Sequence, residues 1–210
     1  MLQVDKVYVT HWNKLVDRKK LLSDQFISQG IDNVSWVENF DKDNWDINEV
    51  KSQFPFIFEK NVQGRYLRHS EISLALKHCW IMMDGIENNY DSILIFEDDV
   101  ILAKSFVESF NKFKNQLPEN WDICFVGSCS NLHCRTVEGL NVYRVNQSRC
   151  CHAYMLSKSG LEKMKPHLNI INEAIDWYFN YKFREMNLNV FWFEPSLAEQ
   201  STKFESTVQF

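Results

Sequence analysis

One stretch near the middle of the chain constrains the fold more than any other. Residues 92–100 read SILIFEDDV, so four apolar residues lead directly into three carboxylates. A short apolar run of this kind predicts a strand that is buried on both faces. In open α/β sheets, ligands bind beyond the carboxyl ends of the strands. The acids Glu97, Asp98 and Asp99 therefore fall where a binding site is expected.

Three adjacent carboxylates repel one another, and burying them unpaired would be costly. The pattern therefore predicts a positive partner at this strand end. A hard divalent cation, Mg²⁺ or Mn²⁺, prefers oxygen ligands and commonly binds substrate phosphates as well. The alternative is a strand that ends in a solvated acidic turn.

The rest of the chain alternates between strand and helix patterns. The opening strand, helix and second strand form the unit of a parallel sheet. Asp17 and Ser70 are the predicted N-caps, and Gly30 is the predicted stop of the first helix. We predict strands at 6–10, 34–40, 92–100, 121–126, 142–145, 151–156 and 190–193; helices at 18–29, 70–88, 104–116 and 171–183; a short helix from Ser157; a loop at 41–49; and a short strand or packed loop at 54–58.

Length and composition limit the classes of protein. The 210 residues, 45% of them hydrophobic, predict one domain over residues 1–200 with a C-terminal tail over 201–210. A net charge of -5 and the lack of basic runs argue against nucleic acid as a partner. The sequence shows neither a signal peptide nor a transmembrane segment. We therefore expect a cytoplasmic protein, with peripheral membrane contact left open.

The chain has six cysteines, and their spacing fits no zinc site. Cys150 and Cys151 are adjacent, which is poor geometry for an ordinary disulfide. We expect reduced thiols, several of them buried as small hydrophobic residues. A bridge between Cys129 and Cys134 is the alternative.

Several stretches together resemble glycosyltransferase family 25, which includes lipopolysaccharide sugar transferases and procollagen galactosyltransferases. They appear in the family's order over about residues 4 to 200. In the helix that begins near residue 70, Glu71, Ile72 and His78 match the family pattern, while Ser73, Leu74 and Lys77 depart from it. The stretches are VYVTHWNKLVDRKKLL, SEISLALKHCW, ILIFEDDVIL, WDICFVG, CCHAYMLSKSGLEKM, AIDWYF and EPSLAEQ.

This resemblance implies a GT-A fold, an α/β architecture in which a Rossmann-like, mostly parallel sheet is flanked by helices. It also implies a nucleotide-sugar donor, a divalent metal and inversion at the anomeric carbon. A UDP-sugar, UDP-galactose or UDP-glucose, is the expected donor, and a glycan, lipopolysaccharide or hydroxylated protein the expected acceptor. The metal would neutralise the charge that develops on the leaving diphosphate.

The expected donor-side residues lie at strand ends and in the first helix. Asp99 is the first choice for the metal, with Asp98 beside it and Gln200 as a further ligand. Glu199 and His152 are the alternatives to Gln200. The remaining expected donor contacts are Thr10, Arg18, Glu97 and Asp98.

Inverting transfer needs a base that takes the proton of the acceptor hydroxyl. Asp176 is the predicted base, because its apolar neighbours would raise its pKa by burial, and Glu173 is the alternative. Asp176 could also cap a helix.

His78 is predicted to bind substrate. An equally good alternative is a histidine on the face of its helix whose hydrogen bonds are made within the protein. Trp12, Trp80 and Trp177 are candidates to stack on a sugar or base, although core packing is the default for tryptophan.

Two other classes of function compete with sugar transfer. A catalytically inactive nucleotide- or glycan-binding module could retain the same fold. A Mg²⁺-binding receiver domain also places acids at strand ends, but it is shorter and carries its acidic pair near the amino terminus. The sequence therefore favours a metal-dependent glycosyltransferase.

Overall fold

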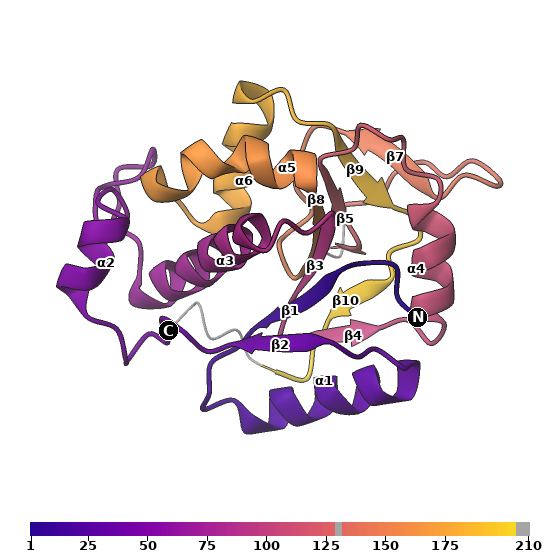
Figure 1. Ribbon diagram of the computed structural model, residues 1–210, viewed down its shortest axis with the longest axis horizontal. Coiled ribbons are helices and arrows are strands. Elements are labelled where there is room, and N and C mark those ends of the chain that lie inside the picture. Colours follow the sequence, from indigo (N-terminus) through magenta and orange to yellow (C-terminus); the bar gives the residue numbers. More distant parts are fainter. Residues whose placement is uncertain (129–131, 205–210) are drawn as a thin grey trace.

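The computed structural model describes residues 1–128 and 132–204, and a seven-stranded sheet lies at its centre (Figure 1). Strands β1, β2, β3, β5 and β9 run in one direction, and β7 and β8 run in the opposite direction. The predicted α/β fold with a mostly parallel sheet is confirmed. The strand order is β2 (Val34–Val37), β1 (Lys6–Thr10), β3 (Ser92–Glu97), β8 (Ala153–Ser157), β5 (Ile123–Phe125), β9 (Val190–Phe193) and β7 (Val142–Val145).

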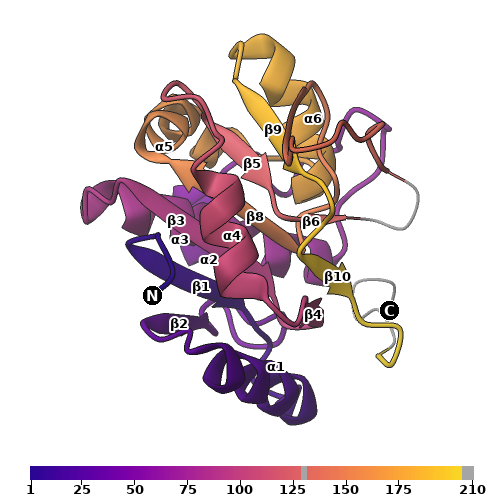
Figure 2. The same cartoon turned by 90° about the vertical axis from the view of Figure 1, so that its right-hand side faces the viewer.

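Helices cover both faces of this sheet (Figures 1 and 2). Alternate residues of β3 point to opposite faces, so Ile93 and Ile95 join one hydrophobic cluster while Leu94 and Phe96 join the other. Burial on both faces explains why β3 is a continuous apolar run. One face packs against α3 (His69–Glu87), α5 (Lys158–Met164) and α6 (Ile175–Glu185), and the other against α1 (Val16–Gln29) and α4 (Phe106–Lys114).

A second, three-stranded sheet brings the C-terminal part of the chain to the acidic strand end. Its central strand is β10 (Ala198–Gln200), which pairs antiparallel with β4 (Val100–Leu102) and parallel with β6 (Gly127–Ser128) (Figure 2). Gln200 is opposite Val100, and the N–H of Ser201 donates to the carbonyl of Asp99 over 2.7 Å. The sequence patterns did not predict β10, and this pairing places Gln200 next to the acids.

Several predicted element boundaries are wrong. A helix, α2 (Ile47–Gln53), begins inside the predicted loop, because the Asp46 side chain accepts hydrogen bonds from the N–H groups of Asn48 and Glu49. Residues 54–58 form the packed loop that was the alternative to a short strand, with Phe54 and Ile57 buried. The segment predicted as helix 171–183 becomes helical only at Ile175, after a 3₁₀ helix, Lys165–Ile170.

The predicted end of α1 is confirmed, and the predicted starts of two helices are wrong. Gly30 ends α1 in a left-handed conformation with φ 64°. The same helix begins after Leu15 rather than at Asp17. Helix α3 begins after Arg68, whose backbone N–H donates to the carboxylate of Glu71 over 2.8 Å. Ser70 therefore lies inside the helix.

The cysteine prediction is wrong at one position. Cys150 is disulfide-bonded, which contradicts the expectation that all six thiols are reduced. Cys134 is a free thiol, so the alternative bridge to it is not supported, and Cys129 itself lies outside the described residues. The described helices are each too short or too polar to cross a bilayer.

Candidate active site

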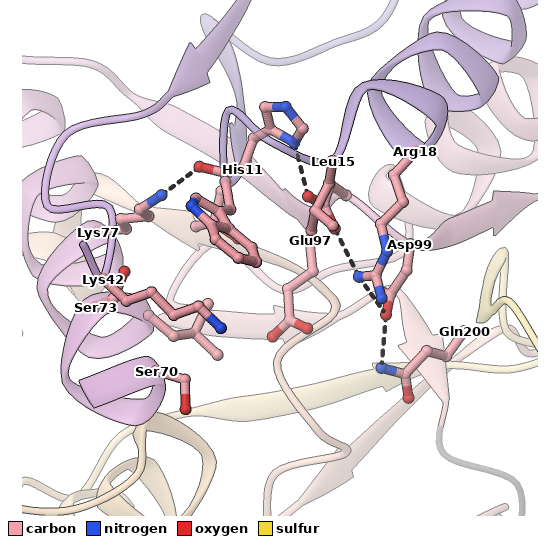
Figure 3. A pocket seen from close by; sticks show the side chains of 14 residues that line it. His11, Leu15, Arg18, Lys42, Ser70, Ser73, Lys77, Glu97, Asp99 and Gln200 are labelled. Carbon is pink, nitrogen blue, oxygen red and sulfur yellow. Dashed lines mark hydrogen bonds and ion pairs between the residues drawn. The ribbon is translucent and has the colours of Figure 1, made fainter. Parts of the chain in front are cut away.

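A recess opens where β1 and β3 end side by side (Figure 3). Thr10 and Glu97, the last residues of the two strands, are partners in the parallel register. The recess encloses about 600 Å³ of space, counted to include its open mouth. Its walls come from the N-terminal ends of α1 and α3, the acidic turn after β3, and β10.

Asp98 is held by two protein groups. Its Oδ1 accepts a hydrogen bond from Nη1 of Arg18 over 3.0 Å, and its Oδ2 lies 2.7 Å from Nδ1 of His11. All three side chains are almost fully buried. Both oxygens of Asp98 are therefore used within the protein, and the residue fixes Arg18 and His11 at the edge of the recess.

Asp99 keeps one oxygen without a partner. Its Oδ2 lies 3.3 Å from Nη1 of Arg18 and accepts a hydrogen bond from Nε2 of Gln200 over 3.2 Å. Its Oδ1 is buried and has no hydrogen-bond partner within residues 1–128 and 132–204. A buried carboxylate oxygen without a partner is costly, so this atom is the best candidate in the cluster for an external ligand.

Glu97 points into the recess, between Lys42 and Gln200 in the view of Figure 3. Its side chain is 19% exposed, and its nearest basic group is Nε2 of His78 at 4.0 Å. Burial, together with the negative charges of Asp99, Asp98 and Asp176, raises the pKa of Glu97 well above its usual value. Burial and the neighbouring carboxylates therefore disfavour the charged form of Glu97, and a cation in the recess would restore it.

The charges of the cluster favour a cation. The three carboxylates share the recess with the guanidinium of Arg18 and the ammonium of Lys42, so negative charge is in excess by one. Lys77 does not change this balance, because it is paired with Asp41 and also donates to the carbonyl of His11. Burial raises the pKa of Asp99, although Arg18 opposes that shift. The local excess of negative charge matches a divalent ion or another positive ligand.

The donor set fits a magnesium- or manganese-like ion that binds mainly to substrate. Within the described residues, no group of three or more His, Cys, Asp or Glu side chains is arranged to hold a metal by itself. Mg²⁺ is usually held by one or two carboxylates and completed by phosphates and water. Oδ1 of Asp99 meets that smaller requirement. Gln200 would add its amide oxygen only after its side chain turns, because its Nε2 now donates to Asp99.

Two residues predicted to bind donor or substrate differ in their placement. Thr10 lines the recess, and its hydroxyl lies 3.5 Å from the carbonyl of Phe96. His78 is fully buried behind Glu97, and its Nδ1 lies 2.8 Å from the hydroxyl of Tyr154. Burial lowers the pKa of His78 to about 3, so the ring is neutral. His78 therefore reaches the recess only through Glu97.

A second recess continues from the first and contains Asp176. Leu74, Glu97 and Gln200 line both, so the two are contiguous. Asp176 lies in the first turn of α6, where its Oδ1 accepts the N–H of Trp177 over 2.9 Å. Burial raises the pKa of Asp176 above the ordinary value. The N-cap of this helix is Ala174, so the interpretation of Asp176 as the cap is wrong.

The alternatives for the base and for the further metal ligand are less well placed than Asp176 and Gln200. Glu173 is buried and accepts a hydrogen bond from Asn61 over 2.7 Å, outside the lining of either recess. The Glu199 carboxylate accepts a hydrogen bond from Ser128 over 3.0 Å. His152 lines the second recess, but its Nε2 lies 3.4 Å from the carbonyl of Ala198. The geometry favours Asp176 over Glu173, and Gln200 over Glu199 and His152.

Sequence patterns did not identify His11 and Lys77 as parts of the site. His11 directly follows β1, so the rule that strand ends form sites could have indicated it. Lys77 is a buried charge on α3, and its pairing with Asp41 joins two segments far apart in sequence. Such a pairing leaves no local signal in the sequence.

The comparisons with known proteins identify the family of the chain. The family model described as glycosyltransferase family 25 (LPS biosynthesis protein) matches residues 4–146, well over half of the chain. The chain belongs to glycosyltransferase family 25. Asp176 and Gln200 lie beyond the matched residues. A search of the curated proteins finds no match.

Solved structures support the fold. A glycosyltransferase involved in the glycosylation of the major capsid of PBCV-1 aligns with a TM-score of 0.55 and 12% identity, over 95% of this chain and 93% of that one. A protein from STIV aligns with a TM-score of 0.48 and 14% identity, over 89% and 79% of the two chains. At 12% identity, the first match establishes a shared fold with a glycosyltransferase. The second match is too weak to add to it.

Proposed function

We propose that this glycosyltransferase is metal-dependent and inverting, and that it moves galactose or glucose from a UDP-sugar to a hydroxyl group of an acceptor. One observation carries the proposal. A recess with an excess of carboxylates is contiguous, through Glu97, with a second recess that contains an acid of raised pKa. The charge of the donor diphosphate would thus be neutralised in the first recess, and the proton of the acceptor hydroxyl would be taken up next to it by Asp176.

The first recess suits the donor's diphosphate. A divalent ion held by Asp99 and Gln200 would offset the phosphate charge when bound. Arg18 is fixed by Asp98 and adds a guanidinium at the same edge. We assign Asp98 to this positioning role, because both of its oxygens are already engaged.

The remaining donor contacts follow from the recess lining. Thr10 and Glu97 lie at the ends of adjacent strands, where hydroxyl groups of the ribose or hexose would meet them. Trp12 offers an aromatic face at the recess, with the ammonium of Lys42 lying 4.1 Å from its centroid. We assign His78 to positioning Glu97 from behind, because it is buried away from the recess.

Asp176 is assigned as the base. As the acceptor oxygen attacks the anomeric carbon, its proton passes to the Asp176 carboxylate and the bond from that carbon to the diphosphate oxygen breaks. Attack on the face opposite the leaving group inverts the carbon. A raised pKa makes the Asp176 carboxylate a better proton acceptor than an ordinary aspartate.

Donor hydrolysis with and without metal tests this function without a known acceptor. We expect the chain to release UDP from UDP-galactose or UDP-glucose, with stimulation by Mn²⁺. Asp99→Asn should abolish the stimulation and leave the melting temperature without metal nearly unchanged. Asp32→Asn, a change at an exposed carboxylate outside both recesses, is the matched control.

Two results would contradict the proposal. Binding of UDP-sugars without turnover under any metal condition would indicate the inactive binding module instead. Full Mn²⁺ stimulation in Asp99→Asn would remove Asp99 from the metal site.

A further inference from the structure

A third hollow continues from Asp176 along the outer side of α6. It shares Cys150 and Asp176 with the second recess, so the path from the first recess past the proposed base to this groove is continuous. The groove holds about 970 Å³ up to its open mouth. A ligand lying in it would present one end to Asp176.

One wall of the groove is an exposed aromatic pair. Trp177 and Tyr181 lie one helical turn apart on α6, with ring centroids 6.5 Å apart and planes inclined at 31°. Their side chains are 50% and 43% exposed, and among the described residues Phe56 and Tyr66 are the only other exposed side chains of Phe, Tyr or Trp. Aromatic faces exposed beside the proposed base, Asp176, suit ligands that have both apolar faces and polar edges.

The groove also presents rigid hydrogen-bonding groups. Asn180 lies between the two aromatic residues in sequence, and its Oδ1 accepts the N–H of Ser148 over 2.7 Å. Its Nδ2 donates to the hydroxyl of Ser148 over 2.9 Å. Asn146 and Gln147 continue this polar lining. Asn180 is held in place by these contacts and by a further hydrogen bond from its Nδ2 to the carbonyl of Asp176 over 3.1 Å. The exposed amides of Asn146 and Gln147, next to the aromatic faces, are the groups that match the hydroxyl groups of a sugar ring.

A positively charged side chain, Arg184, lies at the far end of the groove. Arg184 is eight residues after Asp176 on the same helix, which places it about 12 Å along the axis. Among the described residues, no carboxylate forms an ion pair with it. A neutral acceptor would form no ion pair with this guanidinium, whereas a phosphate or carboxylate on the acceptor would form one.

We propose that this groove binds an oligosaccharide acceptor, with a sugar ring against Trp177 and Tyr181 and an anionic substituent at Arg184. The inference rests on the proposed function and names its acceptor class. A peptide acceptor fits less well. Extended peptides usually add to a free strand edge, and the backbone of α6 is already hydrogen-bonded within the helix.

A glycan array of neutral and acidic oligosaccharides, probed with the full chain, tests the proposal. We expect binding to acidic oligosaccharides that weakens by about tenfold or more in Trp177→Ala and in Tyr181→Ala, the scale for removing an aromatic anchor. Arg184→Gln should weaken binding to acidic glycans and leave neutral analogues unchanged. Tyr66→Ala is the control, because Tyr66 is also exposed and lines none of the three hollows.

Titration of UDP into the same variants separates this inference from the proposed function. Unchanged UDP affinity together with lost glycan binding supports the groove as an acceptor site. No glycan binding by a chain that binds UDP overturns the inference, as does glycan binding that survives both aromatic substitutions. Binding to a hydroxylated peptide in place of glycans also overturns it. A chain that fails to bind UDP contradicts the proposed function instead.

Discussion

Asp98 and Asp99 are neighbours in sequence with similar burial, but the fold gives them different tasks. Both oxygens of Asp98 are engaged by Arg18 and His11, whereas Asp99 retains one oxygen without a partner. The difference arises because β3 ends at Glu97 and the chain turns at the two acids. A sequence pattern could place the acids at a site but could not say which oxygen was unoccupied.

The role of Asp176 can be tested by one substitution. Asp176→Asn preserves the size of the side chain and its ability to accept the N–H of Trp177. We expect donor affinity to be unchanged and transfer to fall by about 100-fold or more, the scale for a positioned base. UDP titration and a sugar-transfer assay measure the two quantities. Loss of donor affinity would instead give Asp176 a donor-side or structural role.

The pH profile of the same reaction gives a second test of the base. Burial raises the pKa of Asp176 above the ordinary 3.8, so the carboxylate becomes protonated at a higher pH than usual as acid is added. We expect kcat/KM to fall on the acid side with an apparent pKa above 3.8. Asp176→Asn should lose that acid limb. An acid limb that persists in this variant would belong to another group.

Glu97 should cost stability when the site holds no cation. Burial and its negative neighbours raise its pKa, so the folded protein binds this proton more tightly than the unfolded chain. The stabilising contribution is therefore present below pH 4.5 and is lost as the pH rises through the raised pKa. At neutral pH, the raised pKa therefore makes Glu97 a net cost of folding.

Glu97→Gln should therefore raise the melting temperature of the metal-free protein at pH 7. We expect a rise of about 2–4 °C for each kcal/mol gained in a chain of this size. Calorimetry at pH 4 and pH 7 should show a larger effect at the higher pH. An equal fall in melting temperature at both pH values would mean that Glu97 stabilises the fold through contacts rather than through its charge.

At the scale of elements, the site depends on β10, a strand of only three residues. Ala-Glu-Gln has little β propensity of its own, so its extended conformation comes from pairing with β4 and β6. That is why sequence patterns missed it. The same pairing places Gln200 against Asp99. The family resemblance suggested that these two residues share a site, but the sequence around Gln200 could not establish the contact.

Gly127 on β6 allows this pairing to be tested away from the acids. A Cβ on residue 127 would lie 2.8 Å from Cδ2 of His152 and 2.9 Å from the carbonyl oxygen of Ala198. We expect Gly127→Ala to destabilise the chain by about 1–3 kcal/mol through overpacking. We also expect it to weaken Mn²⁺-dependent UDP binding, because β10 must shift.

Denaturant unfolding and UDP titration measure the two effects of Gly127→Ala. Gly139→Ala is a comparison at a loop glycine with open space around it, although its positive φ also strains the substitution. Unchanged metal-dependent binding in a destabilised Gly127→Ala protein would show that β10 does not position the ligand.

Other elements were predictable wherever hydrophobic spacing was strong. The predicted bounds of three elements match the structure within one or a few residues: β3, β9, and helix α3 with its buried stripe. The short helix α2 was missed because Asp46 creates its start by a local side-chain cap inside an acidic segment. Residues 54–58 carry the apolar composition of a strand but contain Pro55 and pair with no other strand.

At the scale of the whole molecule, the site is built from segments that are distant in sequence. Arg18 follows the first strand, Asp99 follows the third, and Gln200 comes from the last strand. Their convergence follows from sheet order, which places β1 beside β3 and carries β10 back to β4. The family resemblance gave the fold and the class of reaction, while the contacts among these residues required the structure.

We propose that the acids after β3 bind a nucleotide diphosphate together with a divalent cation. Calorimetric titration of UDP into the wild-type chain and Asp99→Asn, each with and without Mn²⁺, tests it most directly. We predict that Mn²⁺ tightens UDP binding to the wild type by about tenfold or more, equivalent to about 1.4 kcal/mol. Asp99→Asn should retain the metal-free affinity and lose the gain. UDP binding to the wild type that is absent, or that does not respond to Mn²⁺, would contradict the account.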